Sequence, residues 1–128
     1  MYTDGGARGN PGMAGIGIVI EDKNGNIIRE ISQYIGKQTN NVAEYKALSR
    51  GLETALDLGI KKITCYLDSE LVVKQITGEY KVKDEKMISM YNMIVPLIEK
   101  LDSFKIIHVK RELNKKADRL VNEAIDNR

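Results

Sequence analysis

The sequence predicts an α/β fold in which a mixed sheet carries helices on its faces. Two strand-like runs, Met13–Glu21 and Ile27–Ile35, flank the Asn24-Gly25 dipeptide, which is a strong signal for an antiparallel hairpin. Segments of helical period then alternate with two further strand-like runs, Ile60–Leu67 and Phe104–Val109. Crossover helices of this kind join parallel strands, so a hairpin followed by crossovers indicates strands in both directions.

Length and composition favour one domain that covers residues 1–128. The chain has 128 residues, of which 42% are hydrophobic, enough for a packed core. The net charge of +2 gives no overall field that demands a nucleic-acid partner. No apolar run approaches the ~18 residues that a membrane helix needs, and no signal peptide is visible. We therefore expect a cytoplasmic protein with no membrane contact and no obligate protein partner.

The order of elements is predicted to be β-β-β-α-β-α-α-β-α. The short run Tyr2-Thr3-Asp4 is the expected first strand, and it ends at Asp4. Asn41 is a favoured N-cap for the first helix, and Asn114 for the last. Pro96 lies within a longer helical stretch and predicts a kink or an early break there.

Four acidic residues stand at positions that each have an ordinary structural explanation when taken alone: Asp4, Glu44, Asp68 and Asp118. Asp4 suits a turn, and Glu44 suits a helix boundary that reaches solvent. Asp68 is a candidate helix cap, and Asp118 lies where the helix dipole favours an acid.

Together, the four acids indicate a metal site. Asp4 and Asp68 each end a predicted strand, and parallel neighbouring strands would deliver both carboxylates to one edge of the sheet. Carboxylates that converge cannot all stay ionised without cations. Hard oxygen ligands suit Mg²⁺ or Mn²⁺, and a pair of such ions ~4 Å apart is a known device for phosphodiester cleavage.

Four segments carry a resemblance to a known family: "YTDGGARGNPG", "TNNVAEYKAL", "LDSELVV" and "NKKADRL". In this combination and order, the chain resembles the type 1 ribonuclease H family over essentially its whole length. The resemblance implies a ribonuclease H-like fold with a five-stranded mixed sheet. It also implies endonucleolytic hydrolysis of the RNA strand of RNA–DNA hybrids by two divalent cations, which leaves 5′-phosphate and 3′-hydroxyl ends.

The resemblance also assigns residues. Asp4, Glu44, Asp68 and Asp118 match the metal-binding carboxylates of the family, and Asn10, Thr39, Asn40 and Asn41 match positions that contact the hybrid. Asparagine amides can donate to and accept from a ribose 2′-hydroxyl. Gly5 and the glycines that follow it lack a Cβ, which would let a sugar-phosphate approach the backbone closely. Backbone and 2′-hydroxyl contacts carry no base information, so little sequence preference is expected.

The chain departs from the family pattern at three places. It has no tryptophan, and the basic handle helix of some members is replaced by a short segment in which Lys81 and Lys83 form either a reduced handle or a plain polar loop. The histidine of the loop before the last acid is also missing, because the single histidine lies in a strand pattern; Arg111 and Glu112 are the candidates to act there. Glu70 stands where many members carry a substrate-contacting glutamine.

Two other functions remain open at this stage. One is a nuclease of related fold that acts on another substrate, such as a DNA junction. The other is a catalytically silent nucleic-acid-binding module, which the presence of all four acids disfavours.

Overall fold

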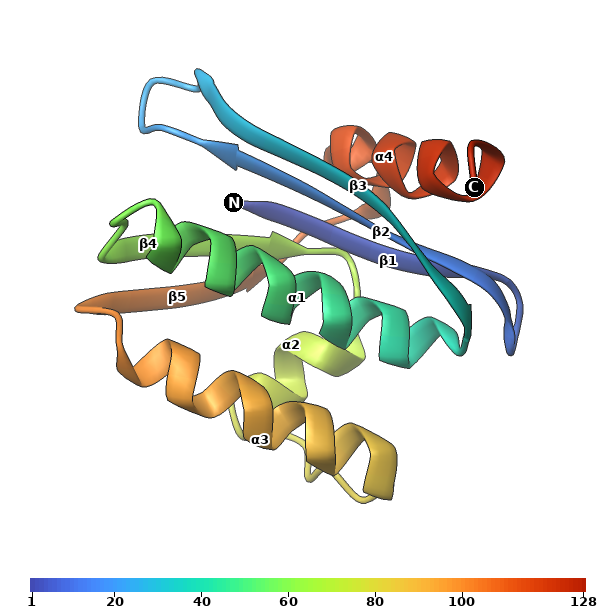
Figure 1. The fold of residues 1–128 in the computed structure, drawn as a ribbon. Coiled ribbons are helices and arrows are strands. Elements are labelled where there is room, and N and C mark those ends of the chain that lie inside the picture. Colours follow the sequence, from blue (N-terminus) through green and yellow to red (C-terminus); the bar gives the residue numbers. More distant parts are fainter.

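One five-stranded mixed sheet with helices on both faces forms the protein, and the computed structural model describes all residues 1–128 (Figure 1). The strand order across the sheet is β3-β2-β1-β4-β5. The predicted order of elements is confirmed. The elements are β1 (Tyr2–Gly9), β2 (Gly12–Glu21), β3 (Ile27–Gln38), α1 (Asn40–Asp57), β4 (Lys62–Leu67), α2 (Glu70–Ile76), α3 (Glu85–Glu99), β5 (Ser103–His108), the 3₁₀ turn η1 (Arg111–Leu113) and α4 (Lys115–Asp126).

The central strand, β1, has a different neighbour arrangement at its two ends. It pairs antiparallel with β2 from Tyr2↔Val19 to Gly9↔Gly12, but parallel with β4 only at Tyr2↔Tyr66. The prediction that the first strand ends at Asp4 is therefore wrong, because β2 continues to hold β1 as far as Gly9 after β4 has diverged. Asp4 lies just past the last parallel pair, at the opening between β1 and β4.

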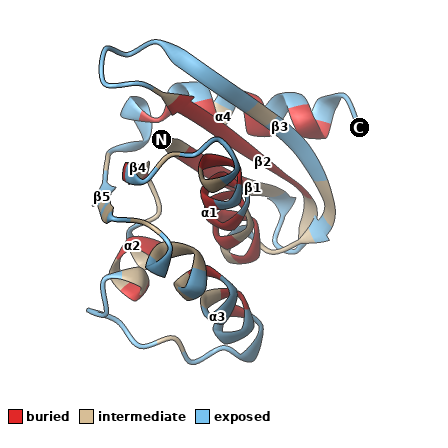
Figure 2. Cartoon of the chain, turned by 60° about the vertical axis from the view of Figure 1, so that its left-hand side comes forward, coloured by how far each residue is buried: buried red, intermediate tan, exposed pale blue.

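The helices cover the two faces of the sheet unequally. α1 packs on one face against β1 and β2, and α3 packs on the outside of α1 (Figure 1). α4 packs on the other face, against β2, β3 and β1. Because helices cover it on both sides, β2 is buried along nearly its whole length, as is the inner side of α1 (Figure 2). No helix combines the length and the apolar composition that a membrane crossing requires.

Two glycines of β2 bring α4 close to the sheet. A Cβ at Gly17 would lie 2.1 Å from the carbonyl oxygen of Ala117, and a Cβ at Gly15 would lie 3.0 Å from that of Val121. Any larger residue at Gly17 would push α4 outwards. The position of α4, which carries Asp118, therefore depends on bare backbone in β2.

The helix termini differ from the sequence prediction in detail. Thr39, not Asn41, is the N-cap of α1: its backbone is extended and its Oγ1 accepts from the Val42 N–H at 3.2 Å. Asn114 does precede α4, but its side chain forms no capping bond. The predicted break at Pro96 is also wrong, since α3 runs on past the proline to Glu99.

Candidate active site

Three of the four predicted acids gather at one point at the centre of the sheet. One carboxylate oxygen from each of Asp4, Glu44 and Asp68 lies within 4.8 Å of the others. Asp4 and Glu44 are only 7% and 6% exposed. The three line a cavity of about 500 Å³, which Asp118 also lines. The chain therefore places four carboxylates around one cavity, three of them at ligand spacing.

Glu44 reaches this point because Gly5 allows α1 to lie against β1. A Cβ at Gly5 would sit 2.2 Å from the carbonyl carbon of Ala43, so no other residue fits here without moving the helix. The Gly5 N–H then donates to Oε1 of Glu44 at 2.6 Å. The missing Cβ of Gly5 thus faces α1. A sugar-phosphate could therefore approach Gly5 only from the cavity side, and this predicted contact stays a prediction.

Asp4 and Asp68 meet because β1 and β4 run parallel. Asp68 directly follows β4, and Tyr66 of that strand is the register partner of Tyr2. Successive residues of β1 point to opposite faces of the sheet, so Asp4 shares its face with Gly6, whose missing Cβ points at Val121 of α4. The site therefore lies at the carboxyl end of β4, where α/β sheets commonly place functional groups.

Asp118 stands apart from the other three acids. It lies in the first turn of α4, lines the same cavity, and does not belong to the group at ligand spacing. Its side chain is 36% exposed, and Nη2 of Arg111 lies 4.0 Å from its Oδ1. The distance between Asp118 and the other three acids therefore depends on where α4 packs against the sheet.

The electrostatics of the cluster favour a cation. Burial raises the pKa of Asp4, and the neighbouring carboxyl of Glu44 raises it further. Burial also raises the pKa of Glu44, although its hydrogen bonds act in the opposite direction. Oε2 of Glu44 is buried and has no hydrogen-bond partner. Closely spaced hard oxygen donors, one of them unsatisfied, fit a divalent cation such as Mg²⁺ or Mn²⁺.

The predicted hybrid-contacting residues form a small network beside the cavity. Oδ1 of Asn10 accepts from the Asn40 N–H at 3.1 Å, and Oδ1 of Asn40 accepts from the Ala7 N–H at 2.8 Å. Asn40 and Asn41 line the cavity, whereas Asn10 and Thr39 do not. Both bonds use amide oxygens, so the Nδ2 donors of Asn10 and Asn40 stay available on exposed side chains.

Of the two loop candidates, Arg111 and Glu112, only Arg111 lies beside the acids. It lines the cavity, whereas Glu112 lines a separate hollow near Tyr2. The single histidine, His108, ends β5 and is exposed. The structure therefore brings an arginine, not a histidine, next to the fourth carboxylate.

The remaining candidates, Glu70, Lys81 and Lys83, do not line the acid cavity. Glu70 is exposed and pairs with Nζ of Lys74 at 2.7 Å, and this hydrogen bond lowers the pKa of Glu70. Lys81 and Lys83 are exposed in the connection between α2 and α3, and Lys81 lines a shallow hollow with Tyr80. Neither lysine lines the acid cavity, so a role for them would require a substrate that extends across α2.

Two cavity residues, Arg8 and Asn122, escaped the sequence analysis. Nη1 of Arg8 lies 2.6 Å from Oδ1 of Asp126, and its Nη2 donates to Oδ1 of Asn122 at 3.2 Å. Arg8 shares the face of Asp4 because strand residues alternate. A predicted strand that extends to Gly9 would place Arg8 on the face of Asp4, whereas a strand that ends at Asp4 does not include Arg8.

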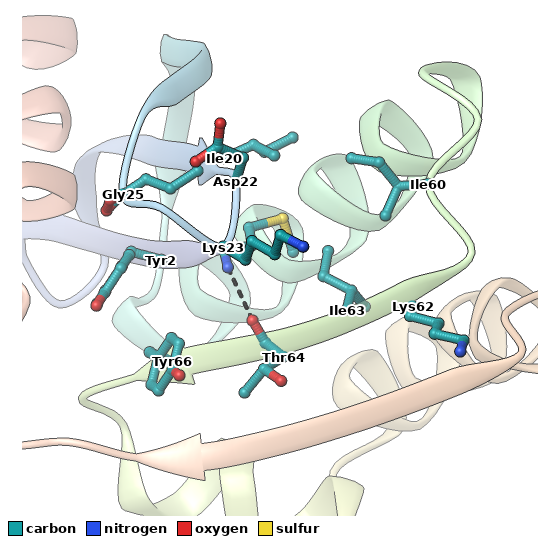
Figure 3. A pocket seen from close by; sticks show the side chains of 12 residues that line it. Tyr2, Ile20, Asp22, Lys23, Gly25, Ile60, Lys62, Ile63, Thr64 and Tyr66 are labelled. Atoms are coloured by element: carbon teal, nitrogen blue, oxygen red, sulfur yellow. Dashed lines mark hydrogen bonds between the residues drawn. The ribbon is translucent and has the colours of Figure 1, made fainter.

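A second hollow, of about 420 Å³, lies at the opposite end of β1 (Figure 3). The rings of Tyr2 and Tyr66 stack there at 4.8 Å, and the amino group of Met1 donates to the Thr64 carbonyl at 2.8 Å. No group of carboxylates at ligand spacing lines it. The chemistry of the molecule is therefore concentrated in the acid cavity.

A mixed five-stranded sheet with buried carboxylates at its centre makes an α/β domain whose acid cavity could hold a metal ion, and comparison with known proteins gives its family. A family model described as reverse transcriptase-like matches residues 2–124. The sequence is 42% identical to ribonuclease HI of Halobacterium salinarum over 98% of this chain. The chain belongs to the type 1 ribonuclease H family.

Solved structures agree with this assignment. The crystal structure of the Halobacterium salinarum ribonuclease H1 matches with a TM-score of 0.96 and 42% identity, covering 99% of this chain and 96% of that one. A ribonuclease H1 isolated from compost, solved in complex with an RNA/DNA hybrid, matches with a TM-score of 0.94 and 49% identity, over 98% and 95% of the two chains.

The curated relatives are longer than this chain. It spans 63% of the Halobacterium protein and 35% of the bifunctional protein Rv2228c of Mycobacterium tuberculosis, to which it is 41% identical over 98% of its own length. What those longer proteins do as wholes does not follow from the shared domain.

Proposed function

We propose that this protein hydrolyses the RNA strand of RNA–DNA hybrids, using divalent cations held by Asp4, Glu44, Asp68 and Asp118. The observation that carries the proposal is the buried cluster of the first three acids, with an unpartnered oxygen on Glu44. Support also comes from the related compost enzyme, which was solved with an RNA/DNA hybrid. The expected products are 5′-phosphate and 3′-hydroxyl ends.

The four acids are the residues that would hold the cations. A pair of Mg²⁺ or Mn²⁺ ions supplies an activated water and stabilises the leaving oxygen in phosphodiester hydrolysis. Asp4 and Glu44 would lose their protons as they become ligands, since a nearby cation favours the carboxylate. Asp68, directly after β4, and Asp118, on α4, would complete the ligand set from two sides.

The asparagine network would select RNA. Asn10, Asn40 and Asn41 offer amide donors beside the cavity, and a ribose 2′-hydroxyl both accepts and donates hydrogen bonds. Gly5, which lines the cavity, and Thr39, which caps α1, are the other two predicted hybrid contacts. Because none of these groups reads a base edge, we propose cleavage with little sequence preference.

Arg111 would bind a substrate phosphate beside Asp118. A guanidinium donates hydrogen bonds in a fork that matches phosphate, but it offers no acceptor for a proton. The arginine therefore suits phosphate binding or product handling, and not the proton transfer that a loop histidine would provide. Contributions of Glu70, Lys81, Lys83 and Glu112 stay predictions.

We also propose that residues 1–128 act as one domain in the cytoplasm, without an obligate protein partner. The single continuous core between α1, α3 and the sheet supports the one-domain proposal. The cytoplasmic setting rests on the sequence expectations alone. Expression of residues 1–128 and measurement of a single cooperative unfolding transition would test the domain proposal.

The decisive experiment is cleavage of an end-labelled RNA–DNA hybrid in Mg²⁺, Mn²⁺ or EDTA. Wild type should cut the RNA strand only with a divalent cation, and Asp68→Asn should lower the rate on the order of 10²-fold or more. Asp57→Asn, which changes an exposed acid at the end of α1, is the matched control and should cut normally. Activity that survives EDTA or Asp68→Asn would contradict the metal mechanism.

Parallel substrates separate the alternative functions. Duplex RNA and a four-way DNA junction, tested under the same conditions, should be poor substrates. Preferential cutting of the junction would establish a related nuclease of different specificity. Hybrid binding without cleavage under every metal condition would establish a silent binding module.

A further inference from the structure

A buried asparagine occupies the junction between the central strand and the last helix. Asn114 is 1% exposed and is among the largest fully buried side chains of the protein. Its Nδ2 donates to the carbonyl oxygen of Thr3 at 2.9 Å, across nearly the whole length of the sequence. Its Oδ1 is buried and has no hydrogen-bond partner. Although asparagine is a favoured helix cap, this side chain does not cap α4.

The bonds of Asn114 join the backbones of two acid-bearing elements. The carbonyl oxygen of Thr3, immediately before Asp4, accepts from the Asn114 side chain. The carbonyl oxygen of Asn114 in turn accepts from the Asp118 N–H at 3.1 Å. A chain of two hydrogen bonds through one residue therefore connects the residue before Asp4 with Asp118 itself.

The position of this bridge follows from the divergence of β1 and β4. Their last register pair is Tyr2↔Tyr66, so the Thr3 carbonyl lies just beyond the parallel ladder, where Asn114 satisfies it. On the sheet side, the carbonyl oxygen of Ala117 packs against the bare backbone of Gly17, and this contact sets how closely α4 approaches the sheet. These two contacts fix the start of α4 in two directions.

Stability alone does not explain this amide. A buried polar atom without a partner is costly, and Oδ1 of Asn114 is such an atom. We propose that Asn114 is a positioning residue that holds Asp118 at the distance from Asp4 which lets the fourth carboxylate share in cation binding. The activity measurements for this proposal rest on the proposed function. The proposal concerns Asp118 because Asp118 lies outside the group of Asp4, Glu44 and Asp68 at ligand spacing.

The activity test compares Asn114→Ala with a control that loosens α4 elsewhere. Leu120→Ala removes a buried side chain of the same helix but leaves the bridge to Thr3 intact. Well below the melting temperatures of both variants, Asn114→Ala should lower kcat at least tenfold with KM changed less than twofold. Leu120→Ala should keep kcat within twofold of wild type. Equal kcat values in the two variants would mean that Asn114 is only structural.

Epistasis with Asp118 provides the sharper discrimination. If Asn114 acts through Asp118, Asn114→Ala should change kcat less than twofold in an Asp118→Asn background, because contacting residues that act as a unit are not additive. A full tenfold loss in that background would overturn the proposal. Asn114→Ser, whose hydroxyl is too short to reach Thr3, should behave like the alanine variant. If neither variant folds, the amide holds the fold and the positioning role is wrong.

A binding measurement keeps this inference separate from the proposed function. Calorimetric titration of Mn²⁺ into Asn114→Ala should show affinity at least fivefold weaker than wild type for one binding event, whereas Leu120→Ala should match wild type. Unchanged Mn²⁺ affinity in Asn114→Ala would overturn the positioning role, whatever the enzyme cuts. If wild type binds Mn²⁺ but cuts no hybrid, the proposed function fails and the titration still decides the role of Asn114.

Discussion

Asp4 and Glu44 make the metal-free protein sensitive to pH. Both carboxyl pKa values are raised by burial above their ordinary values of 3.8 and 4.5, that of Glu44 to about 7. The folded state therefore binds protons that the unfolded chain releases. The contribution of this pair to stability is fully present below about pH 4 and is lost as the pH rises through 7 and beyond. A bound cation would remove this dependence, because it stabilises the ionised forms.

Asp4→Asn should stabilise the metal-free protein at pH 8. The substitution removes a buried group that must otherwise ionise or hold a proton, and the gain should be roughly 2 kcal/mol, given that one pKa unit corresponds to about 1.4 kcal/mol. Urea unfolding in EDTA at pH 5 and pH 8 measures this gain, with Asp57→Asn as the control. If the variant were less stable than wild type at pH 8, the buried carboxyl of Asp4 would not destabilise the folded protein at that pH.

Gly5 and Gly6 are neighbours in β1 but should tolerate alanine very differently. A Cβ at Gly5 would strike the backbone of Ala43, whereas a Cβ at Gly6 would meet only Cγ1 of Val121 at 3.5 Å, an ordinary contact. Gly5→Ala should cost at least about 2 kcal/mol through overpacking, and Gly6→Ala should stay within about 1 kcal/mol of wild type. Denaturant midpoints measured side by side give the comparison. Equal losses would contradict the close approach of α1.

The identity of the acids was accessible from the sequence, whereas the reason for Gly5 was not. Asp68 follows a strand, and Glu44 and Asp118 lie on helices, as the local pattern predicts, whereas Asp4 lies within β1 and not at its end. The residue type of all four acids already indicates a cation. The role of Gly5 depends on how closely α1 crosses β1, which is a tertiary distance with no local signature. The same applies to Asn114, whose sequence position suggests a cap while its side chain bonds a strand far away in the chain.

At the scale of elements, a buried hydrogen bond ties α2 to α1. The hydroxyl of Tyr45 donates to Oε1 of Gln75 at 2.5 Å, and both side chains are buried. Burial also raises the pKa of Tyr45 to about 12, so the hydroxyl keeps its proton. Tyr45 adjoins Glu44, and α2 begins two residues after Asp68. The bond therefore couples the two helices that flank these acids.

Tyr45→Phe should destabilise the protein by about 1–2 kcal/mol. The loss arises because Oε1 of Gln75 would remain buried without its donor. The double variant Tyr45→Phe/Gln75→Leu should recover part of the loss, since both polar partners are then gone. Chemical denaturation of the single and double variants measures the coupling. Strictly additive losses would show that the hydrogen bond contributes nothing.

Element order was predictable because hydrophobic period changes cleanly between strands and helices in this chain. The extent of β1 was not, because Gly5, Gly6 and Gly9 weaken any strand signal, and only pairing with β2 extends the strand to Gly9. The continuation of α3 past Pro96 was missed for a related reason. Packing of its buried face, which includes Met87, Met90 and Ile94, stabilises a helix that local propensity would end.

At the scale of the whole molecule, the placement of charge rather than its sum bears on hybrid binding. The net charge is only +2, yet Lys81 and Lys83 stand exposed together between α2 and α3. A hybrid that extends from the acid cavity across α2 would bring phosphates towards them. Their contribution would be electrostatic and therefore sensitive to salt.

Lys81→Glu/Lys83→Glu should weaken hybrid binding and lower the slope of log K against log salt by up to about 2, since each lost phosphate contact removes about 0.7–0.9. The control is Lys23→Glu/Lys62→Glu, an equal charge change at the far hollow. Fluorescence anisotropy at several salt concentrations measures both. Identical binding by the two double variants would assign the Lys81 segment to an ordinary surface loop.

The bridge from Thr3 to Asn114 also bears on when the acid cavity is completed during synthesis of the protein. Asp4 on β1 precedes α4 in the chain, so it gains its neighbour Asp118 only once α4 has been made and has docked on β2. No nascent fragment that stops before α4 carries the full set of acids. A newly made molecule can therefore assemble its main hydrophobic core, which contains no residue of α4, while its proposed nuclease site is still incomplete. Under the proposed function, cleavage of a hybrid would report that the last helix has docked.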